Sequence, residues 1–368
     1  MKRKVLFFLC FIFIVSGNFD VCAMSAQSAV LIDADTGRVL YSHNSSQLMP
    51  MASTTKIMTA LVAIENGNLD DVVKVSKNAA YQEGTSMYLK VGEEVTLREL
   101  LYGLLLSSGN DAAVAIAEHI SGSVDEFALL MTNRAREAGA AQTTFKNPNG
   151  LDAEGHLTTA LELAKITREA LKNPTFAEIV KTKNITLERG TYTNHNKMLS
   201  MYEGATGVKT GFTKRSGRCL VSSAERGGFS LIAVTLNAPD DWNDHIGMFD
   251  NAYRDYQLVT PVNKGDLLAT VKAGENEKVD LVYADNLHFY LSLDEQTRLK
   301  IENNAPAMLD IPIYKGQVVG SVSAFLDGVL LGKCDIVADS DVLPTEPEKP
   351  KIIQAFYTAF IAWLDAFR

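Results

Sequence analysis

The chain has 368 residues, with 35 basic and 44 acidic side chains and a formal net charge of −9. Its 46% hydrophobic and 21% charged residues exclude a disordered chain, and its length allows two domains of ordinary size. The acidic balance argues against nucleic-acid binding, and no apolar run reaches the roughly 18 residues of a membrane-spanning helix.

The pattern of the first 23 residues indicates an export signal rather than a part of the folded protein. Basic residues at positions 2–4 precede the apolar core 5–15, and small residues stand at the end of the stretch, where a signal peptidase would cut. A buried N-terminal helix is the alternative, but all three features of a signal occur together. We therefore expect an exported, extracytoplasmic protein in which Cys219 and Cys334 remain as buried free thiols.

The folded part opens with a predicted β-hairpin and a helix. The apolar runs 28–32 and 38–41 flank the stretch 33–37, whose residues favour a turn. Apolar residues at helical spacing predict a helix over 53–66, and Gly67 follows as its C-terminal cap.

Further helices and then strands follow in the same part of the chain. The stretches 96–99 and 123–126 have the form of capping boxes, which mark helix starts. The predicted elements are helices at 97–106 and 127–137 and strands at 218–224 and 229–236. A strand pair, then helices, then more strands indicate a sheet with a helical block inserted into it.

The character of the chain changes near Tyr256, where a second domain is predicted. Short strand-like runs with turns between them indicate a small all-β domain. The runs are 267–271, 279–283, 288–293, 318–324 and 329–331. We therefore place one domain at 24–256, a β-rich domain at 257–342 and a Pro-spaced linker at 343–351.

The last segment, 352–368, predicts an amphipathic helix. Its few polar residues fall along one stripe of a helical wheel, and its other positions are mostly apolar and aromatic. At about 1.5 Å per residue the segment spans roughly 25 Å, which is short of the ~30 Å hydrocarbon core. We therefore expect it to lie in the membrane interface and hold the protein peripherally on the outer face. Docking on the protein's own core is the alternative, although a spacer would then be unnecessary.

Three short motifs carry candidate chemistry: Ser53-Thr-Thr-Lys56, Ser108-Gly-Asn110 and Lys209-Thr-Gly211. Each alone is weak, because each also has an ordinary meaning as a helix cap, a loop or a turn. Their order is informative: the first opens a helix, the second follows a helix, and the third precedes a strand. No metal-binding or phosphate-binding pattern accompanies them, so we predict neither a metal nor a cofactor.

These residue types fit nucleophilic acyl transfer without histidine. Ser53 and Lys56 lie three positions apart on a helix, so the amine can reach the hydroxyl. A lysine is a base only when burial or a neighbouring cation such as Lys209 lowers its pKa. Ser108 can relay protons, and Asn110 can donate to a substrate carbonyl.

The backbone around the motifs also suits this chemistry. The N–H of Ser53, in the first helical turn, can stabilise an oxyanion. A strand at 209–213 can pair with an extended peptide, and Gly211 lets that peptide come close.

The three motifs resemble the signature set of the penicillin-binding proteins and serine β-lactamases. The stretches 29–33, 147–151 and 209–213 narrow the resemblance to the low-molecular-weight serine-type D-alanyl-D-alanine carboxypeptidases. The middle motif is Ser-Gly-Asn, as in that family, whereas class A β-lactamases usually have Ser-Asp-Asn. The resemblance extends over the β-rich domain and the C-terminal tail.

The resemblance implies an α/β (α+β) fold: a β-lactamase/transpeptidase-like domain with an antiparallel sheet and a helical lobe, then a small all-β domain and an amphipathic helix. It also implies that Ser53 attacks the penultimate D-Ala of a peptidoglycan stem peptide while Lys56 accepts the proton. Terminal D-Ala would leave, water would hydrolyse the acyl-enzyme, and β-lactams would acylate the same serine.

The resemblance assigns binding residues as well. Lys209 and Thr210 would hold the terminal carboxylate, and the backbone N–H groups of Ser53 and Phe212 would form the oxyanion hole. Arg254 is a further candidate for the carboxylate, although no motif fixes its position. Two other functions stay open: a β-lactamase, whose usual Glu-x-x-x-Asn pattern is missing, and a non-catalytic cell-wall-binding protein.

Overall fold

The computed structural model describes residues 24–344 and 351–366, so the predicted export signal lies outside the described residues. The chain divides into two compact units, with the boundary between Ala252 and Tyr253. Each unit has an apolar core of its own, and the two buried cysteines are free thiols, one in each unit.

The first unit is built on a five-stranded antiparallel sheet with the strand order β2-β1-β9-β8-β7. The predicted hairpin is present as β1 and β2, and β1 is buried along its whole length because it lies inside the sheet. The strand β7 lies at one edge of this sheet. The strands are β1 (Ser28–Asp33), β2 (Val39–His43), β7 (Ala205–Thr213), β8 (Gly217–Arg226) and β9 (Phe229–Leu236).

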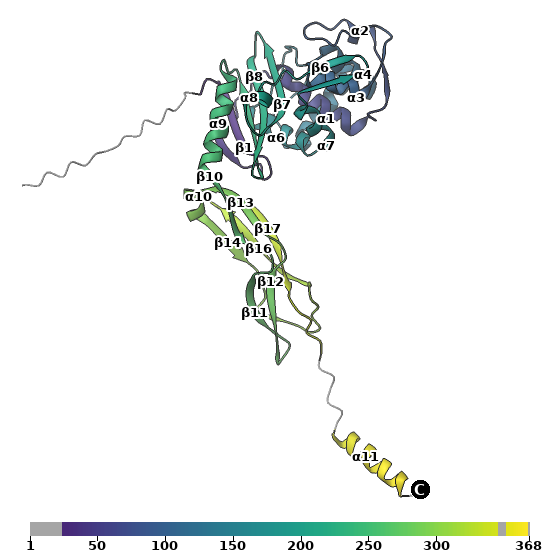
Figure 1. Cartoon of the computed structure of the whole chain (residues 1–368), viewed down its shortest axis with the longest axis vertical. Helices are drawn as coiled ribbons and strands as arrows, with labels where there is room; N and C mark the ends of the chain where they lie inside the picture. The colour runs from purple at the N-terminus through teal and green to yellow at the C-terminus, as the bar shows by residue number, and fades with distance from the viewer. Residues whose placement is uncertain (1–23, 345–350, 367–368) are drawn as a thin grey trace, which may run out of the picture. The chain divides into compact units, whose positions relative to one another are not determined.

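Helices cover both faces of the sheet (Figure 1). Helix α9 lies on one face, and α1, α6 and α7 lie on the other, where most of the apolar core is found. The first eight residues of α1 are all buried, which makes it the central helix of that core. The helices are α1 (Lys56–Asn66), α2 (Lys77–Ala80), α3 (Leu97–Leu105), α4 (Asn110–Ser121), α5 (Val124–Glu137), α6 (Ala160–Leu171), α7 (Pro174–Lys181), α8 (Met198–Met201) and α9 (Asp241–Asp255).

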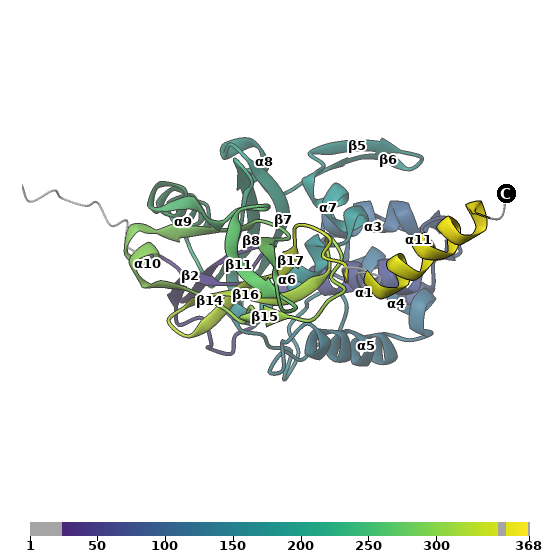
Figure 2. The ribbon, with the colours of Figure 1, turned by 90° about the horizontal axis from the view of Figure 1, so that it is seen from below.

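Two small hairpins complete the first unit. Strand β3 (Val72–Lys74) pairs with β4 (Glu94–Thr96), and β5 (Asn184–Leu187) pairs with β6 (Gly190–Thr193). Figure 2 shows the β5–β6 hairpin beside α3 and α7, at the margin of the unit.

One predicted helix start and one predicted capping box differ from the structure in detail. Thr96 and Ser123 cap α3 and α5 as expected, each accepting the backbone N–H three residues later at 3.2 Å. Because Ser123 is the cap, α5 begins at Val124 and not at residue 127. Glu99 does not complete its box: its carboxylate accepts hydrogen bonds from the Arg189 backbone N–H and the Tyr192 hydroxyl.

The second unit is mainly β-structure. A six-stranded sheet has the order β14-β16-β17-β12-β11-β15, and β10 pairs with β13. All five predicted strands are present, and β10, β14, β15 and α10 are additional. Its elements are β10 (Tyr256–Val262), β11 (Leu267–Ala273), β12 (Glu277–Tyr283), β13 (Leu287–Ser292), α10 (Leu293–Arg298), β14 (Leu299–Asn303), β15 (Met308–Leu309), β16 (Val318–Leu326) and β17 (Val329–Ala338).

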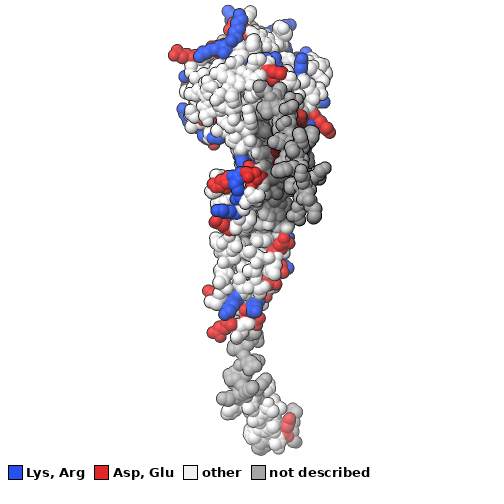
Figure 3. All heavy atoms as spheres, turned by 90° about the vertical axis from the view of Figure 1, so that its left-hand side faces the viewer, with Lys and Arg blue, Asp and Glu red and all other residues white. Residues whose placement is uncertain are grey.

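The predicted terminal helix is present as α11 (Lys351–Asp365). Its side chains from residue 355 to 366 are exposed, including Phe356, Phe360 and Trp363. The face of α11 in Figure 3 is almost free of charged side chains. Within residues 24–344 and 351–366, no helix combines the length and the apolar character needed to cross a membrane.

Candidate active site

Ser53 and Lys56 lie at the entry to α1. A turn of 3-10 helix, η1 (Ala52–Thr55), precedes α1, so the predicted helix start at Ser53 is a tighter turn. The Nζ atom of Lys56 donates to Ser53 Oγ at 2.9 Å, which places the amine beside the hydroxyl. Lys56 also donates to Asn110 Oδ1 at 2.7 Å and to the backbone oxygen of Asn149 at 2.6 Å. The amine is therefore held by three fixed oxygens.

The surroundings of Lys56 favour its neutral form. The residue has no exposed surface, and this burial is the largest cause that lowers its pKa well below the usual value. The nearby charge of Lys209 lowers the pKa further, and Asp111 acts in the opposite direction. An amine poised in this way can accept a proton from the serine hydroxyl.

Lys209 reaches the same cluster from the edge strand β7. It is only 1% exposed, and burial lowers its pKa to about 7. Its backbone pairs with Val221 of β8, which lies in the core on the helical face of the sheet. Its Nζ atom donates to the Thr210 backbone oxygen at 3.0 Å. The strand thus presents a second buried lysine to Lys56.

Ser108 lies in the turn between α3 and α4, and Asn110 is the first residue of α4. Both are buried, and Ser108 has a positive φ of 64°, an unusual conformation for a non-glycine residue. The Asn110 Nδ2 atom donates to the Glu83 backbone oxygen at 2.7 Å, which leaves Oδ1 to accept from Lys56. The structure thus brings all three motifs to one place.

The strand β7 lies close to the serine. A side chain at Gly211 would place its Cβ atom 2.9 Å from the Ser53 backbone nitrogen and 3.1 Å from that of Thr54, so only glycine allows this approach. Phe212 is 66% exposed, and Thr210 is half-buried. The backbone of β7 therefore runs past the N–H groups at the start of α1.

Two contributors were missed by the sequence reasoning. The loop 147–151 supplies the Asn149 carbonyl that binds Lys56, and Gly150, with a φ of 87°, packs so closely that a Cβ atom would overlap the Ala52 carbonyl. The second is Asp111, whose buried carboxylate accepts from Ser86 Oγ and from three backbone N–H groups. In the sequence, Asn147–Leu151 stands out only through the family resemblance, and no motif marks Asp111.

Arg254 is not brought into this cluster. It lies at the end of α9, and its guanidinium pairs with the Asp255 carboxylate at 2.7 and 2.9 Å. Helix α9 contacts the sheet through His245, which bonds to Ser222 and Thr235 on the face opposite the helical lobe. The described residues also include no group of three or more His, Cys, Asp or Glu side chains able to hold a metal ion.

The fold and this cluster indicate a class of protein: a serine-type enzyme whose candidate site holds buried lysines beside the serine. The profile of the D-alanyl-D-alanine carboxypeptidase family, peptidase S11, matches residues 16–240. The profile of the C-terminal domain of penicillin-binding protein 5 matches residues 256–343. The chain belongs to the D-alanyl-D-alanine carboxypeptidase family, and it is thus a serine-type peptidase, a hydrolase.

Similar proteins extend over both units. D-alanyl-D-alanine carboxypeptidase DacF of Bacillus subtilis is 36% identical over 340 residues, which cover 87% of this chain and 86% of that protein. DacC of Escherichia coli is 30% identical over 335 residues, with 86% and 84% coverage. Penicillin binding protein 5 of Haemophilus influenzae has a TM-score of 0.71 at 26% identity, covering 88% of this chain and 98% of its own.

Proposed function

We propose that the enzyme removes the terminal D-Ala from peptidoglycan stem peptides that end in D-Ala-D-Ala. The observation that carries this proposal is the 2.9 Å contact between Lys56 Nζ and Ser53 Oγ in a site where Lys56 is buried and faces Lys209. A nucleophile with a neutral amine beside it, and a cation across the cluster, suits acyl transfer from a substrate that ends in a carboxylate.

In the acylation step, Ser53 Oγ attacks the carbonyl carbon of the penultimate D-Ala, and Lys56 takes the hydroxyl proton. The oxyanion is stabilised by the backbone N–H groups of Ser53 and Phe212. As the peptide C–N bond breaks, the leaving D-Ala nitrogen takes up a proton through Ser108. Water then attacks the ester with Lys56 as base, which frees the shortened peptide and restores Ser53.

The substrate is held along β7. Lys209 and the Thr210 hydroxyl bind the terminal carboxylate, and Asn110 donates to a peptide carbonyl of the substrate. The extended stem peptide pairs with the edge strand, where Gly211 leaves room for its backbone. Arg254 pairs with Asp255 at 2.7 Å. A β-lactam presents a carboxylate and a reactive carbonyl in the same arrangement, so it acylates Ser53.

The enzyme acts outside the cytoplasm, peripherally attached to the outer face of the cell membrane. The exposed aromatic side chains of α11 support this attachment, because an apolar helix face gains free energy on entering the lipid interface. The export signal that we predict at residues 1–23 would deliver the chain there.

A single experiment tests the chemistry. The purified protein is incubated with a D-Ala-D-Ala-terminated peptide, and released D-Ala is measured alongside β-lactam hydrolysis. We expect D-Ala release that exceeds β-lactam turnover, and penicillin labelling that peptide mass mapping places on Ser53. Ser53→Ala should lose both activities. An adduct on Ser108, or labelling that survives in Ser53→Ala, would contradict the proposal.

A further inference from the structure

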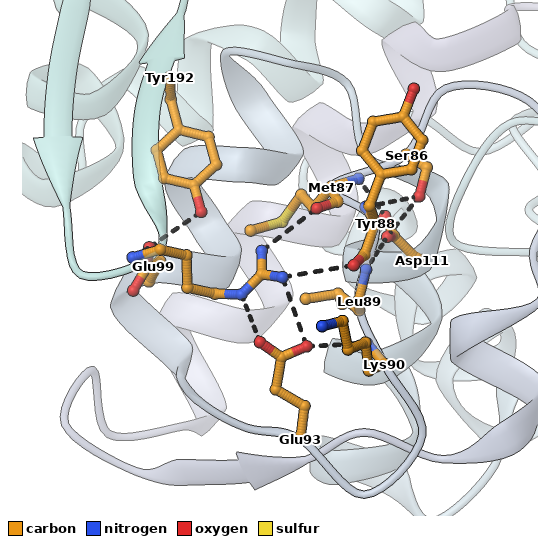
Figure 4. A network of polar contacts seen from close by, with 10 residues as sticks. Ser86, Met87, Tyr88, Leu89, Lys90, Glu93, Glu99, Asp111 and Tyr192 are labelled. Carbon is orange, nitrogen blue, oxygen red and sulfur yellow. Dashed lines mark hydrogen bonds and ion pairs between the residues drawn. The ribbon is translucent and has the colours of Figure 1, made fainter.

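Arg189 ties the tip of the β5–β6 hairpin to the loop 81–93 through hydrogen bonds to Glu93 and to the backbone of Met87 and Tyr88, whose side of the contact is labelled in Figure 4. The Arg189 guanidinium pairs with the Glu93 carboxylate at 2.7 Å from Nε and 3.3 Å from Nη2. It also donates to the backbone oxygens of Met87 at 3.2 Å and of Tyr88 at 3.4 Å. A planar guanidinium can make these contacts together because its donors point in fixed directions.

The backbone of the hairpin tip is held as firmly as its side chain. The Arg189 N–H donates to Glu99 Oε1 at 3.0 Å, and the Tyr192 hydroxyl donates to the same oxygen at 2.9 Å. Glu99 is a buried residue of α3, and α3 leads directly into the Ser108 turn. The guanidinium therefore extends from a fixed point on the helical lobe.

At its other end the loop 81–93 holds Asn110. The Glu83 backbone oxygen accepts from Asn110 Nδ2, and the Thr85 backbone oxygen accepts from the Asn110 N–H, both at 2.7 Å. The neighbouring Asp111 carboxylate accepts from Ser86 Oγ at 2.6 Å and from the Met87 N–H at 2.9 Å. The loop thus orients the amide whose oxygen accepts from Lys56.

The loop needs such ties because part of it is strained. Tyr88 is exposed and has a positive φ of 60°, which is unfavourable for a bulky side chain. Its N–H donates to Ser86 Oγ at 2.8 Å and its oxygen accepts from Arg189, and these contacts offset the strain. Without the guanidinium, we expect the segment around Tyr88 to relax.

We propose that Arg189 is a positioning residue for the carboxypeptidase reaction: it clamps the loop 81–93, which holds Asn110 and through it the Lys56 amine in line with Ser53. This role rests on the proposed function, because it concerns the same proton transfer. Arg189 touches none of the reacting groups, so its effect passes entirely through the loop.

Release of the loop also changes the electrostatics of Lys56. The charged groups that face this amine are Lys209 and Asp111, and burial contributes more than either to its lowered pKa. A loosened loop admits water, which lessens that burial and raises the pKa. The acid limb of the pH–rate profile, where acylation slows as Lys56 takes up a proton, should therefore move to higher pH when the clamp is lost.

The test compares Arg189→Met with a matched control, Arg134→Met. Arg134 makes a similar two-point pair with Glu65, at 2.8 and 2.9 Å. The two pairs also have similar side-chain exposure. It is 20% and 26% for Arg189 and Glu93, and 19% and 31% for Arg134 and Glu65. The control pair joins α5 to the far end of α1, away from the loop. For each variant we measure the thermal midpoint and the rate of acylation by a fluorescent penicillin as a function of pH. We also measure kcat and KM for the D-Ala-D-Ala peptide.

We expect Arg189→Met to lower the acylation rate about tenfold and to move its acid limb upward, with kcat affected more than KM because Lys209 keeps its place. Arg134→Met should lose comparable thermal stability but stay within about twofold of wild type in acylation. Glu93→Gln, which weakens the clamp from the other side, should shift the pH profile in the same direction.

If folded Arg189→Met keeps the wild-type acylation rate and pH profile, the positioning role is overturned. An equal loss of acylation rate in Arg134→Met would overturn it as well. If Arg189→Met does not fold, an unshifted acid limb in Glu93→Gln overturns it equally. Failure of the wild-type enzyme to release D-Ala would instead count against the proposed function, so the two failures are distinguishable.

Discussion

At the scale of single residues, Lys56 can serve as a base only when it is neutral. Burial and Lys209 lower its pKa, whereas a guanidinium at this position would keep its proton. Lys56→Arg should therefore reduce acylation by a fluorescent penicillin at least about 100-fold, the range typical of a general base, although the positive charge is retained. Lys165→Arg, at an exposed position of α6, is the matched control. Near-normal labelling of Lys56→Arg would mean that the lysine supplies only charge.

Lys209 has the opposite requirement, because it must be charged to bind a carboxylate. Its pKa is lowered by burial, so a rise in pH removes its proton and should raise KM for the D-Ala-D-Ala peptide. Lys209→Arg keeps the cation, so KM at neutral pH should rise only a few-fold, and its alkaline increase should move to higher pH. KM measured across pH for both forms checks this. An unchanged alkaline increase in Lys209→Arg would show that another group titrates.

The candidate residues that the structure brings together are those that the three side-chain motifs name. A serine and a lysine three apart at a helix start must lie together, and the structure places Lys56 beside Ser53. The Asn149 contact uses a backbone carbonyl, which no side-chain pattern encodes. The Arg189 clamp joins positions about a hundred residues apart, so only the fold brings its partners together. Arg254 had no motif to fix it, and α9 lies on the other face of the sheet.

At the scale of elements, apolar patterning predicts some buried elements, such as α1 and β9, but the buried helix α6 is not among the predicted ones. The strand β9 is an almost continuous apolar run because it lies inside the sheet, and its predicted bounds are those observed. The strand β14 has no fully buried residue and is held by its ladder with β16. Its apolar alternation covers only Leu299 and Ile301, which is too short to mark a strand. Elements stabilised by backbone pairing alone leave little trace in the sequence.

Helix α9 is attached to the sheet by a buried histidine, which predicts acid sensitivity. His245 bonds to Ser222 and Thr235, and burial lowers its pKa to about 3. An unfolded chain, whose histidines have a pKa near ~6.5, binds more protons between these values, so this part of the stability is complete above pH ~6.5 and is lost toward pH 3. His245→Gln keeps an amide at the site without titrating, and should therefore flatten the decline of the thermal midpoint between pH 6.5 and 4.

The neutral-pH midpoint of His245→Gln should fall, because one imidazole makes both contacts with better geometry than an amide. The control is His288→Gln, at an exposed position of β13, which should keep the wild-type pH dependence. An acid decline in His245→Gln as steep as in wild type would assign the sensitivity elsewhere, with the buried His156, whose pKa is about 4, as the next group to test.

At the scale of the whole molecule, the chain is a series of parts with separate apolar cores. The residues of the motif cluster all lie in the first unit, and the core of the second unit is made entirely of residues between 259 and 342. None of the side chains described in α11, at residues 355–365, belongs to either core. The side chains described in α11 therefore present exposed apolar surface.

Deleting everything after Pro350 should release the enzyme into the soluble fraction with D-Ala release intact. Activity should survive because neither core loses a residue, and membrane binding should be lost because the exposed aromatic face of α11 is removed. Co-sedimentation of full-length and shortened protein with vesicles containing anionic lipid measures the binding, and D-Ala release by the same samples measures the activity.

Substitutions within α11 separate an apolar anchor from other uses of the helix. Phe356→Ser with Trp363→Ser keeps the length of the helix but removes two of its large exposed apolar side chains, so sedimentation with vesicles should fall several-fold. Thr358→Asn changes the polar stripe and should bind as the full-length enzyme does. A shortened protein that still sediments with vesicles, or that unfolds, would contradict attachment through α11. A helix docked on the enzyme's own core would instead lower the thermal midpoint when these aromatic residues are replaced, because apolar burial would then be lost from the fold.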